Sequence, residues 1–252
     1  MKRALLFAVP ALVLSLALFS CSSNPPEPQG QGRVTMYMTD SPASFEEMTV
    51  VISRVNVRSD DGKWITVDDS VRTLNIVNLR NGVVAVLADA YVSTGHYTQI
   101  RLTLESTCTV VIDGQRYVLV LSDKDIKLNY EFTINGGGRH DVLLDFDAAR
   151  SVVYVDGGYR LEPEIRAASM WGSGSIAGTV QSGSASALVT VVSGSDTVTT
   201  YAASMGTFKV MGLSTGSYTV HVQSTQISYP EKVITGVQVV GGLTTNVGTI
   251  AL

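Results

Sequence analysis

The spacing of apolar residues constrains the fold of this chain more than any other feature of its sequence. From Arg33 onward apolar and polar residues alternate in short runs, for example at Val34, Met36 and Met38. This is the period of a half-buried β-strand, and no ten-residue stretch repeats apolar residues at helical spacing. Turn signals separate the runs, and they fall at Asp61-Gly62, Asp113-Gly114, Asn135 to Gly138, Asp156 to Gly158 and Gly241-Gly242. We therefore expect an all-β protein built of sandwiches, with Greek-key or prealbumin-like connections.

Two hairpins are expected from these turns. The first joins residues 109–112 to residues 117–121 across Asp113-Gly114, because both flanking runs have strand composition. The second joins residues 127–134 to residues 142–146 across the glycine-rich loop that begins at Asn135.

The N-terminus has the pattern of an export signal. Lys2 and Arg3 precede an apolar run that ends at Phe19, and Cys21 follows. Residues 1–20 resemble a bacterial lipoprotein signal peptide, which implies that Cys21 is the lipidated mature N-terminus and attaches the protein to a membrane through its lipid. Ser22 after the cysteine favours the outer membrane of the cell envelope. The alternative is a plain secretory peptide that happens to end in cysteine.

Composition divides the rest of the chain into a tether and two domains. Residues 21–32 are rich in proline and glycine and predict an extended tether. Residues 33–171 are conventionally charged and form the first expected domain. Residues 172–252 form the second, which is rich in serine, threonine and valine and has only four charged side chains, at Asp196, Lys209, Glu231 and Lys232.

Net charge and cysteine content exclude some classes of protein. The formal net charge is −4, so the chain lacks the basic footprint of a nucleic-acid-binding protein. Cys21 and Cys108 are the two cysteines, which cannot form a disulfide framework. We expect Cys108 to be a small buried residue in a strand.

One short string occurs in both domains. Residues 93–98 read STGHYT and residues 214–219 read STGSYT, each ahead of an alternating run. A glycine allows a tight turn into the strand, and a tyrosine two residues later can bury its ring while its hydroxyl bonds to the backbone. We expect Tyr97 and Tyr218 to form equivalent tyrosine corners; the alternative is coincidence among common turn residues.

Motifs in the second domain resemble a known family. The segments are Gly178 to Val180, Gly206 to Val210, Gly212 to Val220 and Gly236 to Val239. They are similar to carboxypeptidase regulatory-like, transthyretin-like sandwiches, which implies an extracellular module of a fold that permits carbohydrate binding.

Motifs in the first domain resemble another family. The segments are Gly32 to Val34, Thr39 to Pro42, Val50 to Val55, Trp64, Gly95 to Leu102, Ile126 to Leu128, Leu144 to Asp147, Ser151-Val152 and Leu161 to Arg166. They resemble an envelope lipoprotein family catalogued as domain of unknown function 4382. That family has no assigned activity, so the resemblance implies no site residue.

The sequence has no recognisable catalytic motif. It contains no nucleophile elbow, zinc-protease motif or phosphate-binding loop, and its three histidines lack metal-ligand spacing. Asp145 and Asp147 lie on one face of an apolar strand, opposite Phe146. We expect structural roles for them, such as capping the turn at residues 148–151; a calcium site and a hydrolase pair are the alternatives. Asp40 is expected to shape a turn.

The residues favour binding over catalysis. Sugars stack on exposed aromatic rings, and Trp64, Trp171, Tyr201 and Tyr229 are the candidates, with Tyr229 preferred as the most exposed. The leading hypothesis is a non-catalytic envelope module for binding or adhesion, with glycan as the candidate ligand of the C-terminal sandwich. The alternatives are a structural spacer that docks to another envelope protein and, third, a hydrolase that uses Asp145 and Asp147. No cofactor is expected apart from the calcium alternative.

Overall fold

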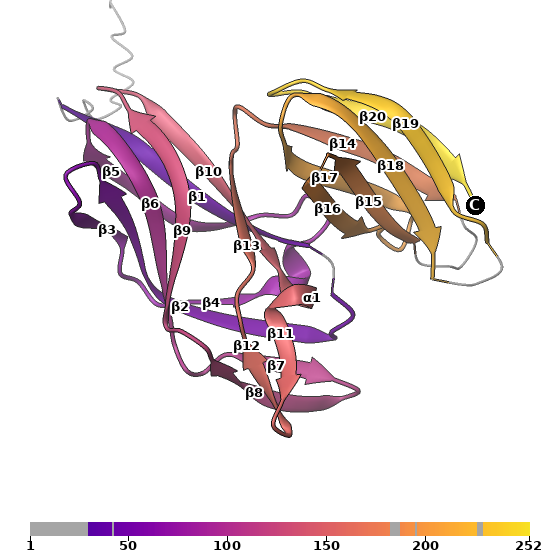
Figure 1. Ribbon diagram of the computed structural model, residues 1–252, viewed down its shortest axis with the longest axis horizontal. Coiled ribbons are helices and arrows are strands. Elements are labelled where there is room, and N and C mark those ends of the chain that lie inside the picture. Colours follow the sequence, from indigo (N-terminus) through magenta and orange to yellow (C-terminus); the bar gives the residue numbers. More distant parts are fainter. Residues whose placement is uncertain (1–29, 42, 182–186, 195, 226–228) are drawn as a thin grey trace, which may run out of the picture.

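The computed structural model is almost entirely made of β-strands (Figure 1). It describes residues 30–41, 43–181, 187–194, 196–225 and 229–252. The predicted signal peptide, Cys21 and most of the tether lie outside the described residues. Within the described part of the chain, no helix is long and apolar enough to cross a membrane. The predicted all-β class is therefore confirmed.

The first part of the chain contains a four-stranded sheet, called the small sheet below. Its strand order is β13-β10-β1-β5, and β1 pairs with β10 in parallel. Even-numbered residues of β1, such as Val34 and Met36, are fully buried, so this face of the sheet covers the core. The strands are β1 (Gln31–Ser41), β5 (Ala85–Ser93), β10 (Arg139–Asp147) and β13 (Ile165–Ser169).

A nine-stranded sheet, called the large sheet, packs against the small sheet. Its main order is β11-β12-β8-β7-β2-β6-β9, and β3 and β4 also pair with the long strand β2. A 3-10 helix (Ile76–Leu79) precedes β5, and a short helix, α1 (Ala148–Ser151), follows β10. The strands are β2 (Glu47–Ser59), β3 (Trp64–Asp68), β4 (Arg72–Asn75), β6 (Gly95–Leu104), β7 (Thr109–Ile112), β8 (Gln115–Leu121), β9 (Asp125–Ile134), β11 (Val152–Val155) and β12 (Gly158–Leu161).

The last part of the chain forms a second, smaller sandwich. A three-stranded sheet of order β17-β14-β20 packs on a four-stranded sheet of order β16-β15-β18-β19. Its core is a cluster of its own, from Ile176 to Ile250, separate from the first core, which runs from Val34 to Leu161. The strands are β14 (Gly174–Gln181), β15 (Ala187–Ser193), β16 (Asp196–Tyr201), β17 (Thr207–Leu213), β18 (Gly216–Ser224), β19 (Lys232–Val239) and β20 (Thr244–Ala251).

One of the two predicted hairpins is present. β7 and β8 pair antiparallel, with Ile112 opposite Gln115 across the Asp113-Gly114 turn. The second prediction is wrong, because β9 belongs to the large sheet and β10 to the small sheet. The glycine-rich loop after Ile134 therefore carries the chain across the sandwich, and β10 pairs with β1 instead of with β9.

Cys108 is buried as predicted, but it lies just before β7 and not within a strand. Its sulfur receives a hydrogen bond from the Val51 backbone N–H and donates one to the Glu105 carbonyl. Burial raises the pKa of this thiol, so Cys108 is a packed, unreactive side chain.

The two predicted tyrosine corners are confirmed. Tyr97 is 2% exposed and its hydroxyl donates to the Ser93 carbonyl at 2.8 Å, while Tyr218 is 5% exposed and donates to the Ser214 carbonyl at 2.9 Å. Each tyrosine is the third residue of its strand, β6 or β18. In both sandwiches the preceding strand belongs to the opposite sheet, so each corner fixes the point at which the chain changes sheets.

Removing either hydroxyl should weaken its sandwich without changing the fold. Tyr97→Phe and Tyr218→Phe each lose one partly buried hydrogen bond, which predicts a loss of about 1 kcal/mol in unfolding free energy. Denaturant unfolding measures this loss, and Tyr154→Phe is the matched control because Tyr154 is 65% exposed. An equal effect of the control would contradict the assignment of the two corners.

Candidate functional site

Three of the four aromatic residues predicted to bind ligand are half-buried, namely Trp64, Tyr201 and Tyr229. The Trp64 ring lies in β3 beneath the Arg101 guanidinium, whose carbon is 4.4 Å from the ring centroid. Tyr201 ends β16, and Tyr229 follows Ser224 in a loop. Tyr229, expected to be exposed, is half-buried in its loop.

The second sandwich carries no prominent aromatic surface. Its sequence contains four aromatic residues, and Phe208 and Tyr218 are buried while Tyr201 and Tyr229 are half-buried. This arrangement does not favour the predicted glycan site on the C-terminal sandwich.

Asp145 and Asp147 have separate structural partners. Asp145 is 7% exposed and forms an ion pair with Arg166, its opposite residue on β13, at 3.2 Å. Asp147 accepts a hydrogen bond from the Arg150 backbone N–H at 3.0 Å and caps α1, as predicted. Within the described ranges, no group of three or more acidic, histidine or cysteine side chains is arranged to hold a metal ion. The geometry gives no support to the calcium and hydrolase alternatives for this pair.

Asp40 is not a turn residue, contrary to expectation. It lies within β1 on the face that covers the core and is 4% exposed. Burial raises the pKa of its carboxyl to about 9, and the negative charges of Asp145 and Asp147 add to this effect. One carboxyl oxygen accepts a hydrogen bond from the Ala148 N–H at 3.3 Å, while the other has no partner. The buried Asp40 carboxyl is therefore protonated at neutral pH.

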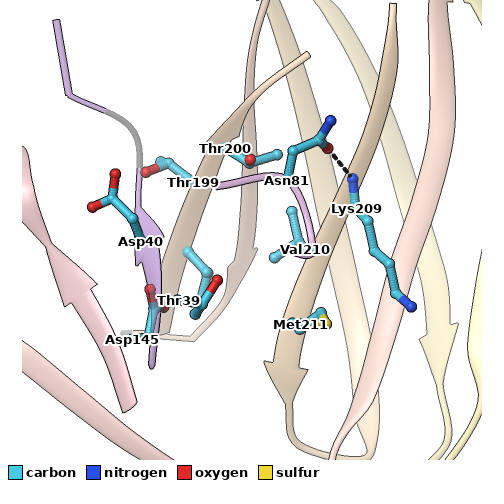
Figure 2. A pocket seen from close by; sticks show the side chains of 11 residues that line it. Thr39, Asp40, Asn81, Asp145, Thr199, Thr200, Lys209, Val210 and Met211 are labelled. Carbon is cyan, nitrogen blue, oxygen red and sulfur yellow. Dashed lines mark hydrogen bonds between the residues drawn. The ribbon is translucent and has the colours of Figure 1, made fainter. Parts of the chain in front are cut away.

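A cavity marks the junction of the two sandwiches (Figure 2). The Asn81 side chain donates to the Thr207 carbonyl at 3.1 Å and accepts from the Lys209 backbone N–H at 2.7 Å. It thus extends the edge strand β17 as another strand would. Arg166 donates to the Gly212 carbonyl at 2.7 Å, so side chains of the first sandwich hold the backbone of the second at both ends of β17.

The outer face of the small sheet carries a different group of side chains. Odd-numbered residues of β1 point away from the core, and the strand register places Tyr91 and Arg139 on either side of Arg33. It places Asp89 and Asp141 on either side of Thr35. We call this surface the outer-face site, and it consists of Arg33, Thr35, Tyr37, Asp89, Tyr91, Arg139, Asp141 and Trp171, which follows β13.

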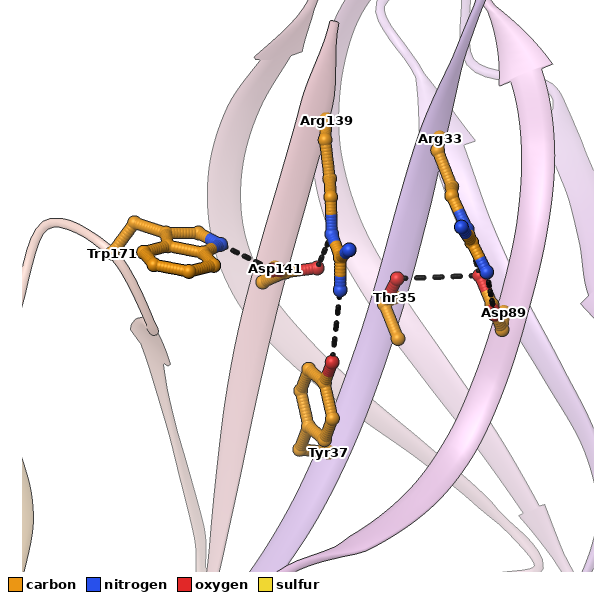
Figure 3. Close-up of polar contacts among 7 residues, drawn as sticks. All are labelled: Arg33, Thr35, Tyr37, Asp89, Arg139, Asp141 and Trp171. Atoms are coloured by element: carbon orange, nitrogen blue, oxygen red, sulfur yellow. Dashed lines mark hydrogen bonds and ion pairs between the residues drawn. The ribbon is translucent and has the colours of Figure 1, made fainter. Parts of the chain in front are cut away.

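Two arginine–aspartate pairs organise the outer-face site (Figure 3). The Arg33 guanidinium donates to both carboxylate oxygens of Asp89, at 2.7 and 2.5 Å. The Arg139 guanidinium donates to Asp141 at 2.8 Å.

Polar side chains around these pairs fix their orientation (Figure 3). Arg139 also donates to the Tyr37 hydroxyl at 3.0 Å, and the Trp171 indole N–H donates to the second oxygen of Asp141. The hydrogen bond from Arg33 holds the pKa of Asp89 below its usual range, and the hydrogen bond to Asp141 raises the pKa of Arg139. The two arginines and the two aspartates have formal charges that sum to zero.

The same site exposes aromatic surface. Trp171 is 65% exposed and Tyr91 is 44% exposed, on opposite sides of the two ion pairs. Tyr91 lies on the edge strand β5, and Trp171 follows β13 at the other edge of the small sheet. A sheet face with rings at its margins and hydrogen-bonding groups between them can stack sugar rings and bond to their hydroxyls.

Of these residues, the sequence predicts only Trp171 as a ligand-binding residue. The alternation at Arg33, Thr35 and Tyr37 was visible as a half-exposed strand, but the residues that flank it come from β5 and β10. Their approach depends on the parallel pairing of β1 with β10, for which no local sequence signal exists.

The comparisons with known sequences bear on the first sandwich. The sequence pattern of the family described as Domain of unknown function (DUF4382) matches residues 31–163, which include Arg33, Tyr37, Asp89, Tyr91, Arg139 and Asp141. The chain belongs to the DUF4382 family. Trp171 lies beyond the matched DUF4382 segment. No curated protein matches the chain in sequence.

Solved structures similar to this DUF4382 protein include a minor pilin and a putative adhesin. The Bacillus anthracis TIE protein is 12% identical with a TM-score of 0.23; the match covers 88% of this chain and 33% of that one, so the chain spans about a third of its length. The minor pilin GBS52 of Streptococcus agalactiae is 13% identical, with 86% and 94% covered and a TM-score of 0.24. A putative adhesin from Bacteroides ovatus is 11% identical, with 89% and 93% covered and a TM-score of 0.21.

Proposed function

We propose that this chain is a non-catalytic, lipid-anchored binding module of the cell envelope that binds glycan at its outer-face site. The observation that carries the proposal is the combination of exposed rings at Trp171 and Tyr91 with two fixed ion pairs on one sheet face. Side chains already locked by their own hydrogen bonds lose little conformational entropy when a ligand binds.

The N-terminal sequence supports an anchored position. Cys21 in a lipoprotein-type signal provides the attachment, and the proline-rich tether leads to β1, which begins at Gln31. Lipid on Cys21 would hold the module at the membrane, and Ser22 favours the outer membrane. We propose that the second sandwich is a carboxypeptidase regulatory-like module that supports the first sandwich and does not itself bind the ligand.

Substitution of the exposed rings tests the glycan proposal. Trp171→Ala and Tyr91→Ala should each weaken binding of an oligosaccharide about tenfold or more, because each removes one stacking surface. Isothermal titration calorimetry against purified oligosaccharides measures the effect. Tyr154→Ala is the matched control, since Tyr154 is as exposed as Trp171 but lies on β11 of the large sheet. Equal losses in all three variants, or no oligosaccharide binding by the unaltered protein, would contradict the proposal.

A structural spacer is the second candidate function. The bonds from Asn81 and Arg166 to the β17 backbone favour it, because they oppose free rotation of one sandwich against the other. If the titrations show no glycan binding while envelope proteins are captured by the purified chain, the spacer is the better account.

A further inference from the structure

The charge balance of the outer-face site restricts the class of glycan that it can take. We propose that the site selects neutral glycans over glycans that carry carboxylate, sulfate or phosphate groups. This inference rests on the proposed function, which names the site but not its ligand class.

Both arginines of the site already have a carboxylate partner. Arg33 uses two N–H groups in a two-bond pair with Asp89, the geometry that an acidic sugar would itself need. Arg139 divides its N–H groups between Asp141 and the Tyr37 hydroxyl. An incoming anion would have to displace an internal carboxylate or lie beside it, and both arrangements cost free energy.

The fixed ion pairs suit hydroxyl groups instead. The side chains of Arg33 and Arg139 are 42% and 44% exposed, so their remaining N–H groups can donate to a ligand. The Asp89 side chain is 34% exposed and can accept. A sugar hydroxyl both donates and accepts, and therefore matches a surface on which a donor and an acceptor stand side by side.

The hydrogen bond from Trp171 to Asp141 strengthens this selection. Asp141 is 1% exposed, with Arg139 on one oxygen and the Trp171 indole N–H on the other. The negative charge of Asp141 thus lies directly beside the indole ring on which a sugar would stack. An acidic group on that sugar would meet this charge, whereas a neutral ring would not.

Two classes of probe test the inference on the purified protein. A neutral chito-oligosaccharide or cello-oligosaccharide series and an oligogalacturonate series are titrated at low and at high salt. We expect binding of a neutral series with little salt dependence, since screening does not weaken contacts with an uncharged ligand. Binding of oligogalacturonate alone would overturn the inference while leaving the proposed function intact, and binding of neither class would overturn both.

Asp89→Asn provides a second test by releasing Arg33 from its pair. It should raise affinity for oligogalacturonate about fivefold at low salt, the effect fading at high salt, because a free guanidinium then faces the ligand. Glu47→Gln is the matched control, since it releases Arg116 from a two-bond pair outside the site whose carboxylate is as exposed as that of Asp89. No gain for Asp89→Asn, or the same gain for both variants, would overturn the inference; the thermal unfolding midpoint of each variant shows whether it is folded.

Discussion

Asp40→Asn is expected to raise the unfolding free energy at pH 7 by about 4 kcal/mol. The buried Asp40 carboxyl holds its proton up to about pH 9, whereas in the unfolded chain it ionises near the ordinary aspartate pKa of 3.8. Between these values the folded protein binds more protons than the unfolded one, so the stability of the native protein falls as pH rises. Asparagine cannot ionise and keeps an oxygen for the Ala148 N–H, so the variant loses this dependence.

Denaturant unfolding from pH 4 to pH 9 measures the effect. The two proteins should have similar stability at the acidic end and diverge steadily toward the alkaline end. Asp89→Asn is a control of opposite sign, because the pKa of Asp89 is lowered by Arg33 and its ionised form stabilises the fold above its unfolded pKa. Parallel pH profiles for Asp40→Asn and the native protein would contradict the protonated state of Asp40.

Gly206→Ala should unfold the second sandwich. Gly206 has a φ of +82°, and an added Cβ would lie 2.0 Å from the Val180 carbonyl oxygen. The same glycine accepts a hydrogen bond from the Val180 N–H at 2.8 Å, so the two backbones cannot separate without loss of that bond. We expect a loss of more than about 3 kcal/mol, from backbone strain and steric overlap together.

Gly248→Ala separates these two causes. Gly248 has a φ of +76°, but nothing lies within 4 Å of its added Cβ. This variant should therefore lose only the strain component, about 1 kcal/mol. The measurement is thermal unfolding of both variants, and equal losses would show that the contact with Val180 has no role.

Local features of the sequence predicted several parts of the structure. Alternation indicated the strands, and the Asp113-Gly114 turn indicated the β7–β8 hairpin, because both depend on neighbouring residues only. The repeated string placed Tyr97 and Tyr218 in equivalent corners, and the position of Asp147 at the end of a strand identified a helix cap.

Features that depend on distant strands were not predictable in this way. A glycine-rich loop serves equally well as a hairpin turn and as a crossing between sheets, and only the pairing of β10 with β1 decides between them. The burial of Asp40 has the same origin, since a polar residue at the end of a strand is usually exposed.

The two tryptophans show most clearly that side-chain exposure depends on the fold. The sequence does not distinguish Trp64 from Trp171. In the structure the Trp64 ring is covered by Arg101, whereas Trp171 is exposed beside Asp141. Which ring remains exposed depends on the side chains that neighbouring strands place over it. The residues of the outer-face site are therefore brought together only by the register of β1 with β5 and β10.

The most direct test of a glycan site on the outer face follows the two tryptophan indole N–H signals by NMR during titration with a neutral oligosaccharide. The chain has two tryptophans, so each signal reports on one place: Trp171 in the site and Trp64 in β3, a different sheet. We expect the Trp171 signal to shift with saturation while the Trp64 signal stays in place. Saturable binding that leaves the Trp171 signal unmoved, or that moves only Trp64, would contradict the account.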